Sequence, residues 1–357
     1  MNKKIFIVSF VFLLIILGGS YFFFNKYYIY ENGKISKISD LREYADFVGA
    51  QNQGKMDDAI KIAQDILDKT PGDIQAMLML AEAYVNKGSH DHEEVEYAPK
   101  ALELVNQILE KDPNNAEAYR IQGYAFEIQE KFDEAVQAYD KSLELKPDDN
   151  IYNSRGHAYE LMGKFQLAEN DYLKGSEINS ENPNIQMNLA RIYLSKGDET
   201  KAKEFAEKVI NNKSGNILAY TKATAYSVLG QIASNNKNKN EAVINFSEAV
   251  KVLPTFKSGY VGRAQTIIVL SDSFTEEEKK QVFNDLNMAV QLDPNSSWSY
   301  FLFGLFYEKQ SNYLNSLENY KKALEVVGAD LTIIPIAREP ISKKYQGKID
   351  SINNKLK

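Results

Sequence analysis

The stretch Tyr226–Pro254, YSVLGQIASNNKNKNEAVINFSEAVKVLP, decides the fold of this 357-residue chain. Small residues stand where two helices would approach each other closely, large residues stand where they would interlock, and a proline stands where the second helix must end. The positions that carry the pattern are Tyr226, Leu229, Gly230, Ala233, Ala242, Phe246, Ala249 and Pro254. Their spacing predicts two helices that pack on each other and are joined by a short turn.

This spacing resembles the tetratricopeptide repeat (TPR), a pair of helices in 34 residues, with Tyr226 where the family has tryptophan. The same positions recur in other copies, among them Tyr119, Gly123, Phe126, Ala135, Tyr139 and Pro147, then Gly156, Tyr159, Ala168 and Tyr172, then Ala190, Tyr193 and Ala202. We count eight repeats, which start near residues 40, 74, 116, 149, 183, 223, 256 and 297. The resemblance implies an all-α TPR-type solenoid, a right-handed superhelix of helix-turn-helix repeats.

Glycines give a second, independent sign of the same frame. Gly54, Gly88, Gly163 and Gly197 each occupy the fifteenth place of a repeat, just past the first helix. A helix often ends with a residue in the left-handed conformation, which glycine adopts without strain. We therefore expect all four glycines to end their helices in this way.

Three repeats are longer than 34 residues. The second gains eight residues around Ser89–Tyr97, the fifth gains six at Asn211–Asn216, and the seventh gains about seven before Thr275. Because insertions in solenoids usually form loops on one face, we expect loops at these places, either as partner contacts or as tolerated surface insertions. Thr275 and Glu278 predict a capping box that restarts a helix.

Residues 331–357 predict a capping segment and helix. After Pro340, apolar residues recur three or four apart at Ile341, Tyr345, Ile349, Ile352 and Leu356. This spacing indicates an amphipathic helix that covers the open side of the eighth repeat. Six basic and two acidic residues give the segment a net charge of +4. The basic residues either lie on a solvated outer face of the helix or form a surface that binds an acidic partner or lipid headgroups.

The N-terminal end differs from the repeats. After a short basic N-terminus (residues 1–4), residues 5–24 carry no charge, which is long enough for a transmembrane signal anchor. The alternative is a cleaved signal peptide with Gly18, Gly19 and Ser20 at the cleavage site. Residues 25–39 predict a tether with a turn at Asn32 and Gly33, followed by eight TPR-like repeats at 40–330. We expect a single-pass protein of the inner (cytoplasmic) membrane with its repeats on the exported, periplasmic side.

Composition excludes several classes of function. With 42 basic and 49 acidic residues the net charge is −7, which argues against a nucleic-acid partner. The chain has no cysteine, which excludes disulfides and thiolate zinc sites. The cluster His90, Asp91, His92, Glu93 and Glu94 is the one candidate metal site, and a solvated charged loop is the alternative that we favour. No nucleotide-binding or hydrolase motif is present, so we expect no enzyme activity, no cofactor and no small-molecule substrate.

The TPR resemblance also implies a binding surface. In the family, places 2, 5, 9 and 12 of the first helices face the concave groove. Carried onto this sequence, these places give Arg120, Tyr124, Glu127, Asn153, His157, Glu160, Met187, Arg191, Leu194, Trp298 and Phe301. For Trp298 and Phe301, core packing or contact with the C-terminal segment is the alternative to a partner-binding patch. The lysine and asparagine of the family's carboxylate clamp are absent from the corresponding places.

The resulting hypothesis is a non-catalytic scaffold or adaptor for protein–protein interaction. It would be anchored in the envelope membrane and would assemble a multiprotein envelope complex of the secretion, pilus, cell-wall or flagellar-motor type. One alternative is a quality-control factor or holdase for exported proteins. The other is a metal-dependent enzyme that uses the loop His90–Glu94.

Overall fold

The computed structural model describes residues 27–31, 34–38, 41–91, 94–212, 217–330, 332–333 and 335–357. The chain divides into an N-terminal unit, Met1–Ile178, and a C-terminal unit, Asn179–Lys357. The expected anchor at 5–24 lies outside the described residues, as does the alternative cleavage site. Within the described ranges, no helix has both the length and the hydropathy that a bilayer crossing requires.

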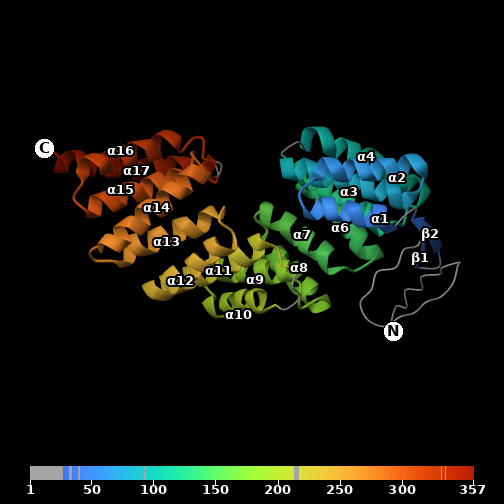
Figure 1. Ribbon diagram of the computed structural model, residues 1–357, viewed down its shortest axis with the longest axis horizontal. Helices are drawn as coiled ribbons and strands as arrows, with labels where there is room; N and C mark the ends of the chain where they lie inside the picture. The colour runs from blue at the N-terminus through green and yellow to red at the C-terminus, as the bar shows by residue number, and fades with distance from the viewer. Residues whose placement is uncertain are drawn as a thin grey trace. The chain divides into compact units, whose positions relative to one another are not determined.

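In the described part of the N-terminal unit, eight helices form four hairpins. Successive helices pack on one another (Figure 1). Their bounds are α1 (Leu41–Asn52), α2 (Met56–Lys69), α3 (Ile74–Asp91), α4 (Glu94–Lys111), α5 (Ala116–Glu127), α6 (Phe132–Leu145), α7 (Asp149–Leu161) and α8 (Phe165–Ile178). The four first helices begin within one residue of the starts given by the sequence repeat at 40, 74, 116 and 149. The prediction of a TPR-like helical fold is confirmed.

A β-hairpin precedes these helices. Strand β1 (Tyr27–Glu31) pairs antiparallel with β2 (Lys34–Ile38), with Tyr27 opposite Ile38 and Glu31 opposite Lys34. The all-α prediction missed these strands, although Asn-Gly between two short runs is a strong sequence signal for a hairpin. Residues 32 and 33 themselves lie outside the described part of the chain.

The residues described in the C-terminal unit form four more hairpins and one additional helix. Its helices are α9 (Pro183–Ser195), α10 (Glu199–Asn211), α11 (Ala219–Asn235), α12 (Lys239–Val252), α13 (Lys257–Leu270), α14 (Glu276–Leu292), α15 (Ser297–Lys309), α16 (Tyr313–Val326) and α17 (Pro335–Lys355). Helix α11 begins four residues before the predicted repeat start at 223. The superhelix handedness stays a prediction.

Close contact between glycine and an aromatic ring holds the two helices of a hairpin together. In α5 and α6, a Cβ added to Gly123 would lie 2.5 Å from the ring of Tyr139. The same contact recurs between Gly156 and Tyr172 and between Gly304 and Tyr320, while Phe246 takes the place of the tyrosine against Gly230. Because these rings are almost fully buried, glycine is required where the helices approach. The repeat frame therefore encodes the packing of each hairpin.

Each unit also contains a buried arginine–aspartate pair that joins the two helices of one hairpin. Arg155 donates to both carboxylate oxygens of Asp171 at 2.7 Å. Arg263 donates to both oxygens of Asp285 at 2.9 and 2.6 Å. Such bidentate pairs fix geometry as well as contribute energy, so they set the register between helices.

The turn after the first helix follows the predicted pattern in three of the four glycine repeats. Gly54, Gly163 and Gly197 have φ of +70°, +72° and +77°. Gly88 differs, because α3 continues through it to Asp91, and the prediction for this glycine is wrong. The same fifteenth place is left-handed in three repeats without glycine, where it holds Glu130, Lys237 and Ser311.

The insertions have different outcomes. The additional residues of the second repeat lengthen α3 and α4 to 18 residues each, so the loop predicted at Ser89–Tyr97 is wrong for the residues that the structure places in these helices. In the fifth repeat, 213–216 lie outside the described residues. In the seventh repeat, the predicted capping box is confirmed. Glu278 N donates to Thr275 Oγ1 at 3.1 Å, and Thr275 N donates to Glu278 Oε2 at 2.9 Å.

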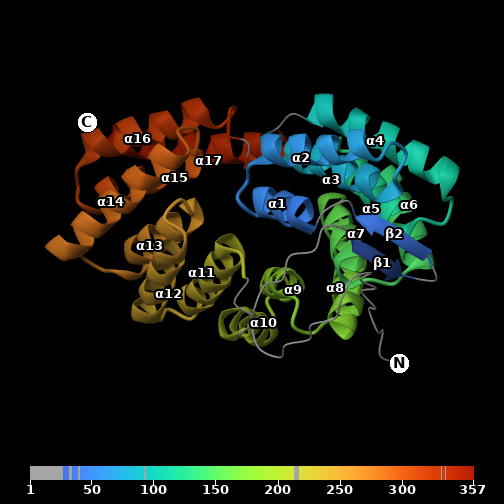
Figure 2. The ribbon, with the colours of Figure 1, turned by 45° about the vertical axis from the view of Figure 1, so that its right-hand side comes forward.

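Helix α17 packs against α16 at the end of the C-terminal unit (Figure 2). Tyr345, Ile349 and Ile352 are buried in a cluster with residues of α15 and α16, so the predicted covering of the eighth repeat is confirmed. The helix begins at Pro335 and includes Pro340, so it starts earlier than predicted, because the expected start was after Pro340. Leu356 lies beyond the helix and is exposed.

Candidate functional site

A groove of about 1540 Å³ lies along the first helices of the N-terminal unit. Residues of α1, α3, α5 and α7 line it, together with Leu145 at the end of α6 and the turns that precede α5 and α7. Nine of the lining residues on the first helices stand at places 2, 5, 9 or 12 of their repeats, which the helical period brings to one face: Tyr44, Val48, Gln51, Gln75, Leu78, Glu82, Glu117, Arg120 and Asn150. Phe47, Met79, Ala116 and Ile151 of the same helices line the groove from other places.

Only Arg120 of these nine residues was among the predicted site residues. The other eight were missed for two reasons. The groove-facing places were applied only to the central and last repeats, and place 2 was left out in the central repeats. Extending the same frame to the first two repeats would have identified Tyr44, Gln51 and Glu82. The signal was therefore present in the sequence.

Part of the groove lining is apolar. Phe47, Met79 and Ile151 line the groove and are buried. Two other lining residues are exposed: Tyr44 on α1 is 39% exposed, and Leu145, the last residue of α6, is 40% exposed. A ligand that covers these two side chains would remove apolar surface from water, which favours binding.

Arg120 forms the polar centre of the groove. Its Nε donates to Glu117 Oε1 at 2.8 Å, and its Nη2 donates to the same oxygen at 2.6 Å and to Glu82 Oε1 at 2.9 Å. Burial alone would lower the pKa of Arg120, but the bonds and charges of Glu117 and Glu82 outweigh it and raise the pKa. The guanidinium is therefore always charged, and it connects α3 to α5.

One donor in the groove wall has no acceptor. Gln51 Nε2, on α1, is buried and makes no hydrogen bond to any described residue. A buried donor without a partner costs free energy, on the order of 1–3 kcal/mol. A ligand that offers a carbonyl oxygen at this wall would satisfy it after a small side-chain movement.

The two helix N-termini at the groove are already capped. Asn115 Oδ1 accepts from Ala118 N at 2.9 Å at the start of α5. Asp148 Oδ1 accepts from Asn150 N at 3.0 Å at the start of α7. Because these side chains satisfy exposed N–H groups, the N-termini offer less to an anionic ligand than uncapped helices would.

The helical part of the N-terminal unit differs strongly in charge from the C-terminal unit. Residues 41–178 contain 28 acidic and 14 basic residues, a net charge of −14. Residues 179–357 contain 19 acidic and 23 basic residues, a net charge of +4. Around the groove itself, the carboxylates of Glu82, Asp112, Glu117 and Asp148 exceed the cations of Arg120 and Lys146. The groove therefore lies in the acidic part of the chain.

The other predicted residues of the central repeats take part in internal contacts and do not line this groove. Tyr124 is half-buried and packs against the core of α3–α5, and burial raises its pKa. Glu127 accepts from Tyr139 Oη at 2.9 Å and lies 2.7 Å from His157 Nδ1. These contacts tie the third repeat to the fourth.

The fourth repeat repeats part of this arrangement. Glu160 Oε2 accepts from Tyr172 Oη at 2.8 Å. Asn153 is half-buried on the same helix, α7. Both residues lie outside the groove, so a role in partner binding stays a prediction for them.

Two of the predicted residues in the C-terminal unit are buried. Met187 is 4% exposed and Phe301 is 2% exposed, so their assignment to a groove-facing surface is wrong. Arg191 is exposed on α9, where its Nη1 donates to Asn188 Oδ1 at 3.3 Å, and Leu194 is half-buried. The repeat frame alone does not report the neighbours that cover Met187 and Phe301.

The aromatic residues of α15 pack against the C-terminal helix. Phe301 stacks on Trp298 at 5.1 Å and on Tyr345 of α17 at 4.8 Å between ring centroids. Lys344 Nζ lies 4.9 Å from the centroid of the Trp298 ring, and Trp298 Nε1 donates to Gln265 Oε1 at 3.1 Å. Contact with the C-terminal segment, one of the two alternatives left open by the sequence, therefore accounts for the burial of Phe301 and covers part of Trp298. A role of Trp298 in partner binding stays a prediction.

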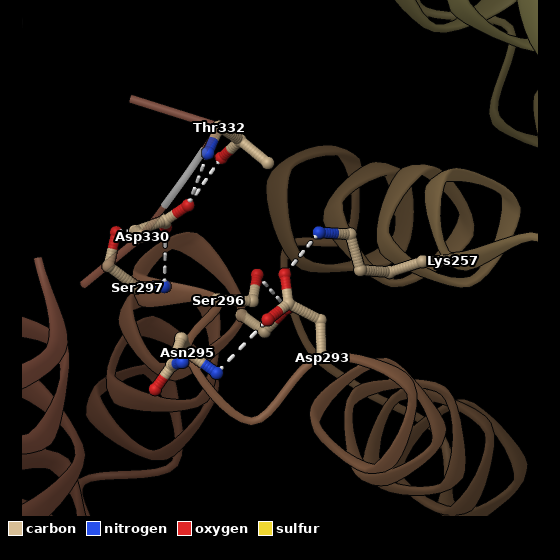
Figure 3. Close-up of polar contacts among 8 residues, drawn as sticks. Lys257, Asp293, Asn295, Ser296, Ser297, Asp330 and Thr332 are labelled. Carbon is tan, nitrogen blue, oxygen red and sulfur yellow. Dashed lines mark hydrogen bonds and ion pairs between the residues drawn. The ribbon is translucent and has the colours of Figure 1, made fainter. Parts of the chain in front are cut away.

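A second polar cluster lies at the ends of the last repeats, and its residues form hydrogen bonds and an ion pair with one another (Figure 3). Asp330 accepts from Ser297 N and Oγ, both at 2.8 Å, and from Thr332 N at 3.0 Å. Burial raises the pKa of Asp330, but these bonds outweigh it and leave the pKa below its ordinary value. Asp293 accepts from Lys257 Nζ at 2.6 Å. The cluster holds α13, α15 and the turn after α16 in place.

No group of three or more His, Asp or Glu side chains suited to a metal ion occurs among the residues that the structure describes. His92 and Glu93 of the proposed metal site lie outside them. The backbone places His90 and Asp91 at the end of α3 and Glu94 at the start of α4. The metal-site hypothesis therefore stays untested.

Stacked helical hairpins, glycine–aromatic contacts and a groove along the first helices define a helical-repeat protein. Sequence comparison matches residues 98–150, and separately residues 150–182, 183–216 and 223–255, to the tetratricopeptide repeat. The chain therefore contains tetratricopeptide repeats, as the resemblance predicted.

Proteins of other organisms are similar to this chain. A TPR repeat-containing protein of Methanocaldococcus jannaschii, MJ1428, is 25% identical over 250 residues, which are 70% of this chain and 37% of the relative. Small glutamine-rich tetratricopeptide repeat-containing protein 2 of Saccharomyces cerevisiae is 31% identical over 163 residues, which are 45% of this chain and 44% of the relative. The chain spans less than half the length of both relatives.

Among solved structures, the Cut9–Hcn1 hetero-tetramer of the APC/C resembles this chain with a TM-score of 0.62 and 14% identity. The match covers 86% of this chain and 57% of the other. At this identity the likeness shows the fold alone.

Proposed function

We propose that this chain is a non-catalytic protein-binding scaffold whose N-terminal groove holds an extended segment of a partner protein. The observation that carries the proposal is the groove itself, which four successive first helices line with their groove-facing places. Repeat stacks of this kind use extended concave surfaces to bind other proteins. Tetratricopeptide repeats are interaction modules, which agrees with this role.

The size of the groove suits an extended polypeptide. Helices pack roughly 8–10 Å apart, so four first helices extend over about 25–30 Å. An extended chain rises about 3.3 Å per residue, and the groove would therefore hold about eight residues. The exposed rings and aliphatic groups of Tyr44 and Leu145 would bind its apolar side chains.

We propose further that residues 5–24 anchor the scaffold in the inner membrane, with the repeats on the exported side, where they assemble an envelope complex. The support comes from the sequence, because 20 uncharged residues after Lys3 and Lys4 match the thickness of a bilayer core. Protease added to intact spheroplasts would digest the repeats if they face outward. Complete protection, with digestion only after lysis, would overturn this orientation.

Site-specific photo-crosslinking in the native cells tests the groove. A photo-reactive amino acid is placed at Val48 or Gln75, which line the groove, or at the control position Lys61, which is exposed on α2 and does not line it. We expect mass spectrometry to identify the same defined proteins from both groove positions and not from Lys61. Equal products from all three positions would contradict a groove-bound partner. A scattered set of unrelated exported proteins would favour the quality-control alternative.

A further inference from the structure

The charges on the groove walls are unequal at its centre. Two carboxylates, Glu82 and Glu117, share the single guanidinium of Arg120. Their side chains remain 35% and 48% exposed, so solvent and ligands reach the excess negative charge. Charges within about 8 Å interact strongly at physiological salt, and more distant ones are screened. The excess negative charge of Glu82 and Glu117 would therefore interact strongly with a segment bound in the groove.

Cationic positions around the groove are few. Among the lining residues that the structure describes, Lys146, in the turn before α7, is the basic residue besides Arg120. The N-termini of α5 and α7 are capped by Asn115 and Asp148 and do not attract a carboxylate as uncapped helices would. Asp112 adds another carboxylate at the turn before α5. An acidic segment would therefore meet repulsion along the groove.

Two further features point to a polypeptide. The unpartnered Gln51 Nε2 donor lacks a hydrogen-bond acceptor, and a peptide carbonyl supplies one. The exposed surfaces of Tyr44 and Leu145 offer apolar contacts in the same groove as the charged residues. A segment that carries basic residues together with an apolar residue matches these surfaces.

We propose that the groove of the N-terminal unit selects a cationic segment of a partner protein, an extended stretch in which Lys or Arg residues lie beside an apolar anchor. This inference rests on the proposed function. It adds the chemical class of the ligand: the basic side chains pair with Glu82 and Glu117, and the apolar side chain packs against the apolar part of the groove lining. Electrostatic complementarity of this kind determines specificity and speeds association.

The first test measures binding of three labelled peptides to the full-length chain by fluorescence anisotropy. The basic probe has ten residues with four lysines and two leucines among serine and glycine. The neutral and acidic probes replace the lysines with glutamine and glutamate. We expect the basic probe to bind at least about tenfold more tightly than the neutral one, and its affinity to fall as NaCl rises from 50 to 300 mM.

Paired variants then separate the groove from the general charge of the unit. The double variant Glu82→Gln/Glu117→Gln is expected to bind the basic probe about five- to tenfold more weakly. Arg120→Gln is expected to bind it about two- to fivefold more tightly, because both carboxylates become available to the ligand. A residue with a merely structural role would weaken binding in every variant, so the opposite signs identify a direct electrostatic role. Circular dichroism verifies that each variant is folded.

The matched control is Glu103→Gln/Glu134→Gln, on α4 and α6. These exposed residues do not line the groove, and their replacement changes the net charge by the same amount. We expect the control to bind the basic probe within about twofold of the unaltered chain, since screening removes distant charges. Equal weakening by both double variants would show diffuse attraction to the acidic unit and would overturn the inference.

Further outcomes separate this inference from the proposed function. If neutral and acidic probes bind as tightly as the basic one, and Val48→Arg abolishes binding of all three, the groove binds segments but does not select cations. If Val48→Arg leaves binding of every probe unchanged and crosslinking at Val48 captures nothing, the proposed function itself is wrong. Dimerisation that Glu82→Gln/Glu117→Gln abolishes would assign the cationic segment to a second copy of this chain and overturn its assignment to another protein.

Discussion

The N-terminal and C-terminal units have the same hairpin architecture but use their groove-facing places in different ways. In the N-terminal unit, Tyr44 and Glu117 at such places face an open groove. In the C-terminal unit, Phe301 at the same kind of place is buried among aromatic rings, and α17 covers it. The first surface is acidic and accessible, and the second is part of a core.

This difference shows that a place in the repeat fixes the direction of a side chain but not what covers it. Both surfaces follow from the same helical period. Phe301 is buried and Trp298 is partly buried, because Tyr345 and Lys344 of α17 pack against these rings. The experiments below test whether the two units depend on their groove-facing residues as differently as the structure indicates.

The largest expected effect is that of Phe301→Ala in the C-terminal unit. The change removes a buried ring from contact with Trp298, Tyr320 and Tyr345 and leaves a cavity. Loss of a buried phenylalanine costs about 3–5 kcal/mol of unfolding free energy. Hydrogen exchange should show faster opening of α15–α17 and unchanged protection of α3–α6.

The control for this variant is Phe283→Ala, because Phe283 is 44% exposed on α14. We expect it to cost less than about 1 kcal/mol, since partly exposed rings lose less burial and leave no closed cavity. Urea unfolding of both variants gives the comparison. Equal losses would mean that the burial of Phe301 does not distinguish the C-terminal unit.

The next effect concerns the glycine–aromatic contacts that both units share. Gly123→Ala and Gly304→Ala would each place a methyl group within 2.5 Å of the ring of Tyr139 or Tyr320. Overpacking of this kind costs about 1–3 kcal/mol, which exceeds the gain in helix propensity. Thermal unfolding should show a similar loss in both units.

The controls are Gly49→Ala in α1 and Gly347→Ala in α17. An added methyl group meets nothing within 4 Å at either position. Because alanine favours helix over glycine, we expect a gain of about 0.5–1 kcal/mol. Destabilisation by all four variants would show that helical glycine matters for a reason other than ring contact.

A smaller effect is expected for Glu308→Gln, and it should depend on pH. Burial raises the pKa of Glu308, but hydrogen bonds from Tyr320, Lys348 and Lys355 outweigh it and lower the pKa from 4.5 to about 2. Because the pKa is lower in the folded state, the stabilisation is complete above pH 5 and is lost as pH falls toward 2. We expect the variant to lose about 1–2 kcal/mol at pH 7, after allowance for solvent screening, and little near pH 2.

Urea unfolding at pH 7, 5 and 3 checks this dependence. Glu325→Gln serves as the control, because Glu325 pairs with Lys322 on the exposed face of α16. Exposed pairs contribute less than about 1 kcal/mol, so this control should change little at any pH. A constant loss for Glu308→Gln from pH 7 to pH 3 would rule out the carboxylate as its cause.

The smallest effect is expected at the turns. Lys237 has φ of +58°, a conformation that strains any residue with a Cβ. Lys237→Gly should stabilise the chain by up to about 1 kcal/mol, and Gly163→Ala at the equivalent turn should destabilise it by a similar amount. Differential scanning calorimetry of both variants provides the measurement. Shifts of Tm in the same direction would contradict the assignment of strain.

Much of the fold could be predicted because each repeat encodes its own hairpin. Gly123 and Tyr139 lie 16 residues apart, and their contact follows from the repeat alone. The prediction of a left-handed turn at Gly88 was wrong because α3 continues past the expected turn in the longer second repeat. No local signal in the sequence marks this change. The strands between Tyr27 and Ile38 were missed. A turn at Asn32 and Gly33 was predicted, but an all-helical fold was expected, so no strands were assigned on either side of it.

The positions in the repeat that face the groove could be predicted from the sequence. Which of these side chains are buried by other segments could not. Places 2, 5, 9 and 12 identify part of the lining of the N-terminal groove, including Gln51 and Glu82, but Tyr124 and Glu127 at the same places do not line it. The burial of Met187 and Phe301 depends on packing between segments distant in sequence. The excess charge around Arg120 also required the structure, because one arginine between two carboxylates is visible only when α3 and α5 are placed side by side.

The contact at Glu308 has a consequence for how such an array grows. In the third repeat, Glu127 accepts from the tyrosine of its own hairpin and meets His157 of the next repeat. Glu308 accepts from Tyr320 in the same way, and it meets Lys348 and Lys355 of α17. Helix α17 therefore imitates the first helix of a further repeat. A gene duplication that inserts a hairpin between α16 and α17 would find compatible contacts on both of its sides, so repeat number can change in evolution without a new terminal interface.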